Sequence, residues 1–325
     1  MRRSTSLVLM ATHVACAAGT YVCSKLATDG FPSPAALTLA RALLATVLLL
    51  LLTGTVIPKP DFDGPTWLKL FGLGILQVPI NQYLFLRGLK STAPSHAALL
   101  YALTPLVVLL ISAARVKQWP PRRMLTGVVV ALAGAVVVLR PWEGSDAARA
   151  SRSGDLWILA AVFAWAIYTV AVRELCRRHD PRVVAGWNLI LGSLAMMPFG
   201  AAALKELDFQ RVTTAAWIGL FWMAAITSVV MNLLWTILLR HLQPVQVTIC
   251  MNAQPPATAA LQVALQAQPL LFGIAFNAEP LGLRFFVGMA LVLCGVVFVN
   301  WRRGPQVTVS ADESRAPPPS STAGR

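Results

Sequence analysis

Neutral polar side chains occur deep inside the apolar stretches of this sequence. Gln77, Asn81 and Gln82 surround Pro79 in one such stretch. Other amide, imidazole and phenol groups of this kind include His96, Tyr101, Asn232, Asn252 and Gln254. Polar groups inside hydrocarbon usually face a bundle interior or a watery cavity, so these residues are candidates for a substrate pathway. The alternative is that they form hydrogen bonds that only hold helices together.

Two aromatic residues, Trp165 and Tyr168, lie one helical turn apart in another apolar stretch. Their rings could stack against an aromatic or cationic solute. Packing against neighbouring helices is the ordinary alternative. Pro79, Pro105 and Pro255 each remove a backbone hydrogen bond and leave a carbonyl free. These prolines could offer backbone acceptors to a solute, or they could be kinks that fit helices together.

Enzyme and metal-site signatures are missing. The sequence contains no GxxxxGK[ST], HExxH or GxSxG motif, and its five cysteines form no CxxC pair. We therefore expect no catalytic activity, no cofactor and no metal. The net charge of +14 is divided into short clusters between apolar stretches, which argues against nucleic acid as a partner.

Composition identifies the class of protein that must position these residues. Hydrophobic residues make up 57% of the chain and charged residues only 12%, with a mean hydropathy of +0.66. Soluble domains carry about 25% charged residues. The sequence therefore predicts an all-α integral membrane protein in contact with the lipid bilayer. The basic N-terminus resembles a signal peptide, but its apolar character continues to Ala27, which favours a first membrane-spanning helix.

Ten stretches are long enough to span a membrane, which takes about 20 mostly apolar residues. They are residues 6–27, 34–56, 66–86, 94–114, 121–140, 154–173, 182–203, 212–237, 244–272 and 281–301. If the N-terminus is inside, 17 of the 27 Lys and Arg lie on the inner side and 9 on the outer side. This bias predicts that both termini are cytoplasmic.

The two halves of the chain resemble each other. A shift of 150 residues places Trp67 on Trp217 and Pro94 on Pro244, and a shift of 161 places Gly127 on Gly288. About eleven extra residues must therefore lie after Pro255, in the ninth span or its outer loop. Each half has five spans, an odd number, so the halves must be inverted relative to each other in the membrane. Inverted repeats are typical of secondary transporters.

Several motifs resemble the EamA branch of the drug/metabolite transporter superfamily over about residues 6–302. They include Lys25 at the end of the first span, Arg41 in the proline-started second span, the ALLYALTPLVVLL and GVVVALAGAVVVL segments, and GDLWILAAVFAWAIYTVAVREL at the start of the second half. The chain departs from the family at Ala17-Ala18, where Trp-Gly is usual, and at Gln118, where an acidic residue is usual. The resemblance implies a central pathway lined by the first, third, fourth, sixth, eighth and ninth helices.

The resulting domain prediction is a first five-helix repeat at residues 1–142 and an extracytoplasmic linker at 143–153. A second repeat follows at 154–302, with a disordered cytoplasmic tail at 303–325. The predicted function is an inner-membrane carrier that exports a small, amino-acid-like metabolite. The carrier could form a homodimer. The alternatives are a non-transporting receptor or assembly protein, and a lipid enzyme.

Few charged or titratable groups lie inside the spans. All 13 acidic residues fall in connectors, in the tail or in the first or last turn of a span. The gating or coupling candidates are therefore His13, Lys25 and Arg41, with the prolines named above. Because proton-coupled carriers commonly use a buried carboxylate as a relay, the sequence predicts a facilitator, or a carrier whose pH response comes from His13.

Overall fold

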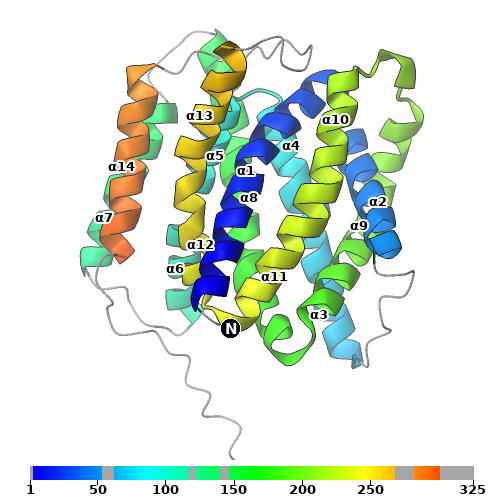
Figure 1. Cartoon of the computed structure of the whole chain (residues 1–325), viewed down its shortest axis with the longest axis horizontal. Coiled ribbons are helices and arrows are strands. Elements are labelled where there is room, and N and C mark those ends of the chain that lie inside the picture. Colours follow the sequence, from blue (N-terminus) through cyan, green and yellow to red (C-terminus); the bar gives the residue numbers. More distant parts are fainter. Residues whose placement is uncertain are drawn as a thin grey trace, which may run out of the picture.

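Helices account for most of the described chain, which in this computed structural model comprises residues 3–52, 62–115, 117, 122–139, 146–267 and 282–300. Consecutive helical elements join into ten rods that stand side by side (Figure 1). The first five rods are α1 (Arg3–Gly30), α2 (Pro34–Leu52), α3–η1–α4 (Gly64–Ile75, Leu76–Gln82, Tyr83–Leu89), α5–α6 (Pro94–Tyr101, Thr104–Arg115) and α7 (Arg122–Leu139). The second five are α8 (Asp146–Arg178), α9 (Pro181–Lys205), α10–η3–α11 (Thr214–Trp222, Met223–Met231, Asn232–His241), α12–η4–α13 (Pro244–Thr248, Ile249–Ala253, Gln254–Ala267) and α14 (Leu283–Asn300), with a short turn η2 (Phe209–Arg211) before α10. The predicted all-α fold with ten helices is confirmed.

Local sequence explains where several rods begin. Pro34, Pro94 and Pro181 occupy first helical positions, where a missing N–H costs nothing and the fixed φ angle suits the helix. Asp180 precedes α9, and its side chain accepts a hydrogen bond from the Arg182 backbone N–H at 2.8 Å. Such caps satisfy backbone donors that a helix start leaves free.

The sixth rod is longer than predicted. Because α8 begins at Asp146, residues 146–153 of the predicted 143–153 linker are helical and continuous with the sixth span. Their sequence, DAARASRS, is rich in alanine and arginine, which favour helix. Residues 143–145, the tail from 303, Gln118 and the segment 268–281 that follows α13 lie outside the described residues.

Contacts between rod ends show that the halves are inverted. The Lys25 side chain near the end of α1 donates to the Leu89 carbonyl at the end of α4, 3.1 Å away. The Glu174 side chain near the end of α8 pairs with Lys69 near the start of α3, also at 3.1 Å. Since the α3–α4 rod starts and ends on opposite sides, α1 and its counterpart α8 run in opposite directions.

The first rod of each half packs on the other half. α1 contacts α10 and α13 of the second repeat, and α8 contacts α4 and α6 of the first repeat. In the same way α2 packs against its counterpart α9. The repeats therefore share one interior, built from equivalent rods of both halves.

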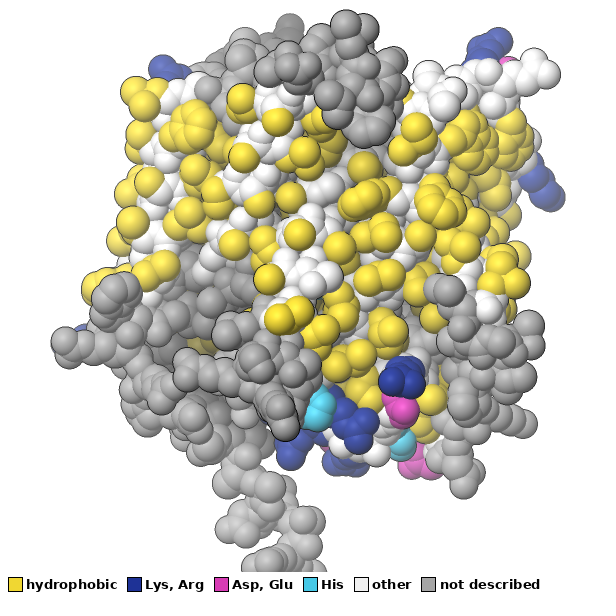
Figure 2. Space-filling view, in the orientation of Figure 1, with side chains coloured by type: hydrophobic (Ala, Val, Ile, Leu, Met, Phe, Trp, Pro, Cys, Tyr) yellow, Lys and Arg dark blue, Asp and Glu magenta, His cyan; other side chains and the backbone are white. Residues whose placement is uncertain are grey.

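The outer face of the bundle is apolar. Figure 2 shows hydrophobic side chains over the middle of the molecule, with Lys, Arg, Asp and Glu near its edges. Leu68, Phe199 and Leu283 are each at least 70% exposed, which suits contact with lipid. Among the described residues, five helices are long and apolar enough to cross a membrane: Pro34–Leu51, Pro94–Arg115, Ser151–Arg178, Pro181–Lys205 and Thr214–His241. Shorter apolar helices are Thr126–Val138 and Leu283–Gly295.

The fifth and tenth rods, α7 and α14, pack closely through glycines. These glycines occupy equivalent positions in the two repeats. A Cβ atom on Gly134 would lie 2.7 Å from the Gly288 carbonyl oxygen, and one on Gly295 would lie 2.6 Å from the Gly127 carbonyl oxygen. Small residues allow such backbone approach in membranes, where packing rather than the hydrophobic effect holds helices together.

Replacing Gly134 with Ala should therefore destabilise the protein by about 1–3 kcal/mol, because either backbone must move to admit the methyl group. Thermal unfolding in detergent measures this as a lower melting temperature. The matched control is Gly72→Ala in α3, where nothing lies within 4 Å of the added Cβ atom. Equal melting temperatures for the two variants would contradict the close α7–α14 contact.

Candidate functional site

A cavity of about 110 Å³ lies at the interface of the two repeats. Nine residues proposed above from the sequence line it, namely His13, Arg41, Gln77, Asn81, Gln82, Tyr101, Trp165, Asn232 and Gln254. They come from α1, α2, η1, α5, α8, α11 and α13. These elements belong to the six rods that the family resemblance implies, with α2 in addition.

Two π-helical segments, η1 and η3, together with the first residue of α11, present matching positions to the cavity. Gln77, Asn81 and Gln82 lie in η1 and are spaced i, i+4, i+5. The 150-residue shift places them on Thr227, Met231 and Asn232, which also line the cavity. The wider turn of a π-helix brings positions with this spacing to one face, and π-bulges are frequent at functional sites.

Hydrogen bonds cross the repeat interface at the cavity wall. The Gln77 amide nitrogen donates to the Asn232 Oδ1 atom at 3.0 Å, and the Asn188 amide donates to the Gln77 oxygen. The Tyr21 hydroxyl donates to the Gln254 Oε1 atom at 3.0 Å. These bonds satisfy some of the polar side chains in the cavity wall and link the two repeats.

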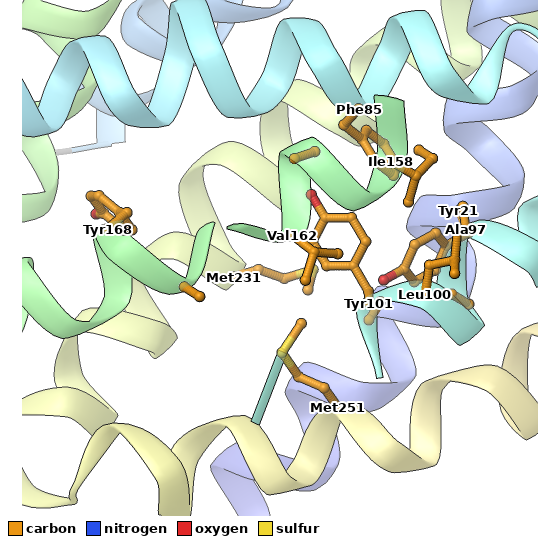
Figure 3. Packing of buried hydrophobic residues seen from close by; sticks show 14 of the residues in the cluster. Tyr21, Phe85, Ala97, Leu100, Tyr101, Ile158, Val162, Tyr168, Met231 and Met251 are labelled. Carbon is orange, nitrogen blue, oxygen red and sulfur yellow. The ribbon is translucent and has the colours of Figure 1, made fainter. Parts of the chain in front are cut away.

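Aromatic clusters bound the cavity. Tyr21, Phe85 and Tyr101 pack edge to face, with ring centroids 5.7–6.1 Å apart (Figure 3). In a second cluster, Trp235 lies 5.2 Å from the His13 ring and 5.3 Å from the Trp165 ring. The site can therefore contact a solute with both hydrogen-bonding groups and ring faces.

Three predicted pathway residues lie outside the cavity lining. Tyr168 is fully buried and stacks on Trp165 at 5.2 Å, so it supports the wall from behind. Asn252 is half-buried, between the lining residues Met251 and Gln254. His96 stacks on Phe285 of α14 at 5.9 Å.

The prolines also lie outside the lining. Pro105 cannot donate to the Tyr101 carbonyl, and the Thr104 hydroxyl donates to that oxygen instead, at 2.6 Å. Near Pro255, the Gln254 backbone N–H donates to the Met251 carbonyl. Pro79 lies half-buried within η1. Both carbonyls freed by Pro105 and Pro255 thus have partners in the protein, which favours the interpretation of these two prolines as kinks.

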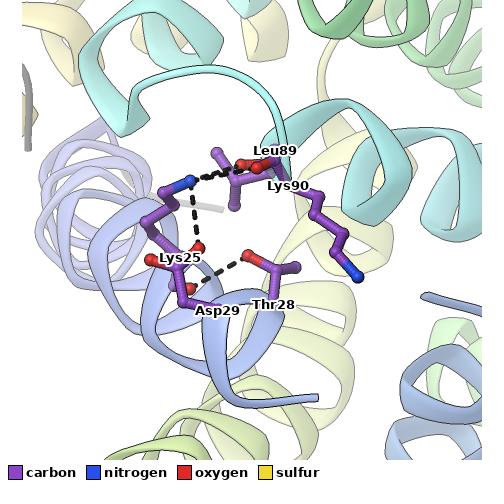
Figure 4. A network of polar contacts seen from close by, with 5 residues as sticks. All are labelled: Lys25, Thr28, Asp29, Leu89 and Lys90. Carbon is purple, nitrogen blue, oxygen red and sulfur yellow. Dashed lines mark hydrogen bonds and ion pairs between the residues drawn. The ribbon is translucent and has the colours of Figure 1, made fainter. Parts of the chain in front are cut away.

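Lys25 forms a cap at one end of the bundle (Figure 4). Its Nζ atom lies 3.1 Å from the Leu89 carbonyl, 3.3 Å from the Lys90 carbonyl and 3.1 Å from the Asp29 carboxylate. Cations near the last carbonyls of a helix stabilise its end. Lys25 therefore ties α1 to α4 and does not reach the cavity wall.

One carboxylate is buried within a helix, contrary to the expectation from the sequence. Asp155 is 1% exposed, accepts a hydrogen bond from the Thr92 hydroxyl at 2.5 Å and lies 3.7 Å from the His96 Nδ1 atom. The sequence placed Asp155 in the first turn of a span beginning at 154. Because α8 begins at Asp146, this residue lies inside the helix, facing the turn between α4 and α5.

Several lining residues were not proposed from the sequence: Ala17, Thr20, Tyr21, Phe85, Met231 and Met251. Two signals could have found some of them. His13, Ala17 and Tyr21 follow each other at intervals of four on α1 and so share a helix face. The 150-residue shift pairs Met251 with Tyr101 and Met231 with Asn81.

Ten helices in two inverted repeats, with a cavity at the repeat interface that polar and aromatic side chains of both halves line, define the architecture of a membrane transporter. The model of the EamA-like transporter family matches residues 4–140 and 152–301, and the chain belongs to this family. The predicted relation to drug/metabolite transporters is confirmed, and the family consists of transporters rather than enzymes.

Known relatives agree with this assignment. The uncharacterized transporter YyaM of Bacillus subtilis is 24% identical over 83% of this chain and 85% of its own. The uncharacterized inner membrane transporter YicL of Salmonella typhimurium is 25% identical over 67% of this chain and 68% of its own. A solved crystal structure shares the fold with a TM-score of 0.62 and 20% identity, covering 93% of this chain and 100% of that one. The chain is thus a multi-pass membrane transporter.

Proposed function

We propose that this transporter is a secondary carrier that binds a small metabolite in the central cavity and exports it by alternating access. The amino-acid-like cargo and the outward direction follow from the family resemblance. Rocking of one repeat against the other would expose the cavity to each side of the membrane in turn.

The observation that carries this proposal is the equivalent contribution of both repeats to one cavity. Gln77, Asn81 and Gln82 of the first repeat have their counterparts Thr227, Met231 and Asn232 in the same wall. In carriers built from inverted repeats, substrate sites lie at this interface. The volume of about 110 Å³ suits a small solute rather than a lipid or a peptide.

Solute flux distinguishes a carrier from a receptor or assembly protein on the same scaffold. Metabolites retained or lost by deletion and overexpression strains would first identify the cargo. Purified protein in liposomes should then move that solute down its gradient with saturable kinetics, and empty liposomes should not. A solute that binds the purified protein without any flux would favour the receptor alternative.

We also propose that both termini are cytoplasmic in the inner membrane, which rests on the distribution of Lys and Arg. In the structure, Arg178 at the end of α8 and Lys69 near the start of α3 lie on the same side as the start of α1, and Glu174 pairs with both. Arg182 and Arg240 flank neighbouring rod ends on that side.

A reporter that is active only in the periplasm should therefore be inactive when fused after Arg303 and active when inserted near Ser145. The expected difference is close to all or none, because a reporter domain does not cross the membrane unaided. Equal expression of the fusions, measured by immunoblot, is the control. The reverse pattern would overturn the proposed orientation.

A further inference from the structure

Arg41 places a positive charge in the wall of the cavity, and the described residues around it supply no matching negative charge. Its side chain is 4% exposed, and its Nε atom donates to the Ser228 Oγ atom at 2.9 Å. Ser228 is neutral, and the described residues that line the cavity include no Asp or Glu. In the part of the chain that the structure describes, no ion pair includes Arg41.

An unpaired ion away from water is strongly unfavourable, so buried charges normally have a partner of opposite sign. Cations elsewhere in this protein follow that rule: Lys25 pairs with Asp29 and Lys69 pairs with Glu174, each at 3.1 Å. Both of those pairs lie at rod ends, where water also solvates the charge. The buried guanidinium at the repeat interface therefore requires an anion that none of the described residues provides.

The atoms that remain free define the chemistry of that anion. Ser228 occupies the Nε donor of Arg41, and the two terminal amino groups of the guanidinium are left to bind a ligand. A planar guanidinium fork matches a carboxylate with two parallel hydrogen bonds. A phosphate carries more charge, and protein sites for it commonly use several donors or a helix N-terminus, whereas this cavity presents one cation.

We propose that the cargo is a small carboxylate whose carboxylate group binds the free terminal nitrogens of Arg41. The rest of the molecule lies among the amide and aromatic side chains of the same cavity, where the Trp165 indole N–H and the Gln82 Oε1 atom have no partner within the described part of the chain. Because Arg41 belongs to α2 and Ser228 to η3, the bound anion lies at the contact of both repeats. This assignment names the substrate class of the proposed carrier and rests on that function.

Binding tests the assignment with matched pairs of carboxylates and their neutral amides. The probes are acetate and acetamide, lactate and lactamide, and benzoate and benzamide, with inorganic phosphate as a further anion, at constant ionic strength. Thermal unfolding of the purified full-length protein in detergent is the measurement. At least one carboxylate should raise the melting temperature saturably, with an apparent affinity at least about tenfold higher than that of its amide.

Variants of Arg41 separate ligand binding from a structural role. Arg41→Gln should abolish the preference for carboxylate over amide, and Arg41→Lys should retain part of it. The matched control is Arg211→Gln, which removes an exposed arginine outside the cavity. Without ligand, Arg41→Leu should raise the melting temperature, because removal of an uncompensated buried charge is stabilising.

Each alternative result is decisive. No response to any carboxylate, equal responses to carboxylate and amide, or a preference for phosphate would overturn the assignment. A lower melting temperature of ligand-free Arg41→Leu would likewise indicate a structural role. Carboxylate binding that depends on Arg41 without flux in liposomes would support the site and refute the carrier. Flux of a neutral solute without carboxylate binding would support the carrier and refute the carboxylate site.

Discussion

Replacement of Ala17 by Phe should reduce solute flux by at least about tenfold while the protein stays folded. Ala17 is 2% exposed on α1 and lines the central cavity, so the added phenyl ring would enter the space of about 110 Å³ that the cargo needs. Overpacking of a filled core costs about 1–3 kcal/mol, and an existing cavity lowers that cost. Flux into liposomes and thermal unfolding, measured on the same preparation, report the two effects.

Ala15→Phe is the matched control, because Ala15 lies on the same helix and is exposed on its outer face. It adds the same ring toward lipid and should leave flux and melting temperature close to those of the parent protein. Unchanged flux in Ala17→Phe would place the pathway elsewhere, and loss of flux in both variants would indicate a general effect on α1.

Flux of an identified cargo should persist without a proton gradient, and any pH dependence should disappear in His13→Gln. His13 is 4% exposed, lines the cavity and packs on Trp235 at 5.2 Å. Its Nδ1 atom has no hydrogen-bond partner in the regions that the structure describes. The other titratable or charged groups of the cavity wall are Tyr21, Tyr101 and Arg41. Because gain of a proton would add charge next to the cargo, we propose that His13 sets the pH response.

Asp155 supplies the competing mechanism, since it is a buried carboxylate close to His96. Asp155→Asn keeps an acceptor for Thr92 but cannot exchange a proton with the solvent. Initial flux rates at several pH values, with and without an imposed proton gradient, compare the two variants. Uphill transport that is lost in Asp155→Asn and unchanged in His13→Gln would contradict the proposed role of His13.

The architecture of this protein could be predicted from the sequence because the bilayer restricts the possible structures. Each span must satisfy its own backbone hydrogen bonds, so a long apolar stretch can only be a helix. Pro94 and Pro244, which the repeat pairs, each begin a rod in the structure. The 150-residue shift also aligns η1 with η3. It pairs Gln82 with Asn232, and both residues line the cavity.

Residue type also identified much of the candidate site. Gln77, Asn81 and Asn232 were proposed because amide groups inside hydrocarbon need polar surroundings, and all three line the cavity. Asn252, proposed on the same grounds, is half-buried outside the lining, and its Oδ1 atom has no hydrogen-bond partner among the described residues. Position within an apolar stretch indicates that a polar side chain lies inside the bundle, but the helix face that meets the cavity depends on how the helices pack.

The sequence by itself determined the membrane class, the ten helices, the inverted repeat and the family, since each depends on local hydropathy or on spacing along the chain. Only the tertiary structure decided how polar residues are partnered. Asp155 is buried because α8 starts earlier than its apolar stretch and passes the turn between α4 and α5. The described residues give Arg41 no carboxylate, because those that line the cavity with it carry neutral side chains. Partnership depends on contacts between distant segments, such as Arg41 with Ser228, and these contacts exist only after the helices have packed.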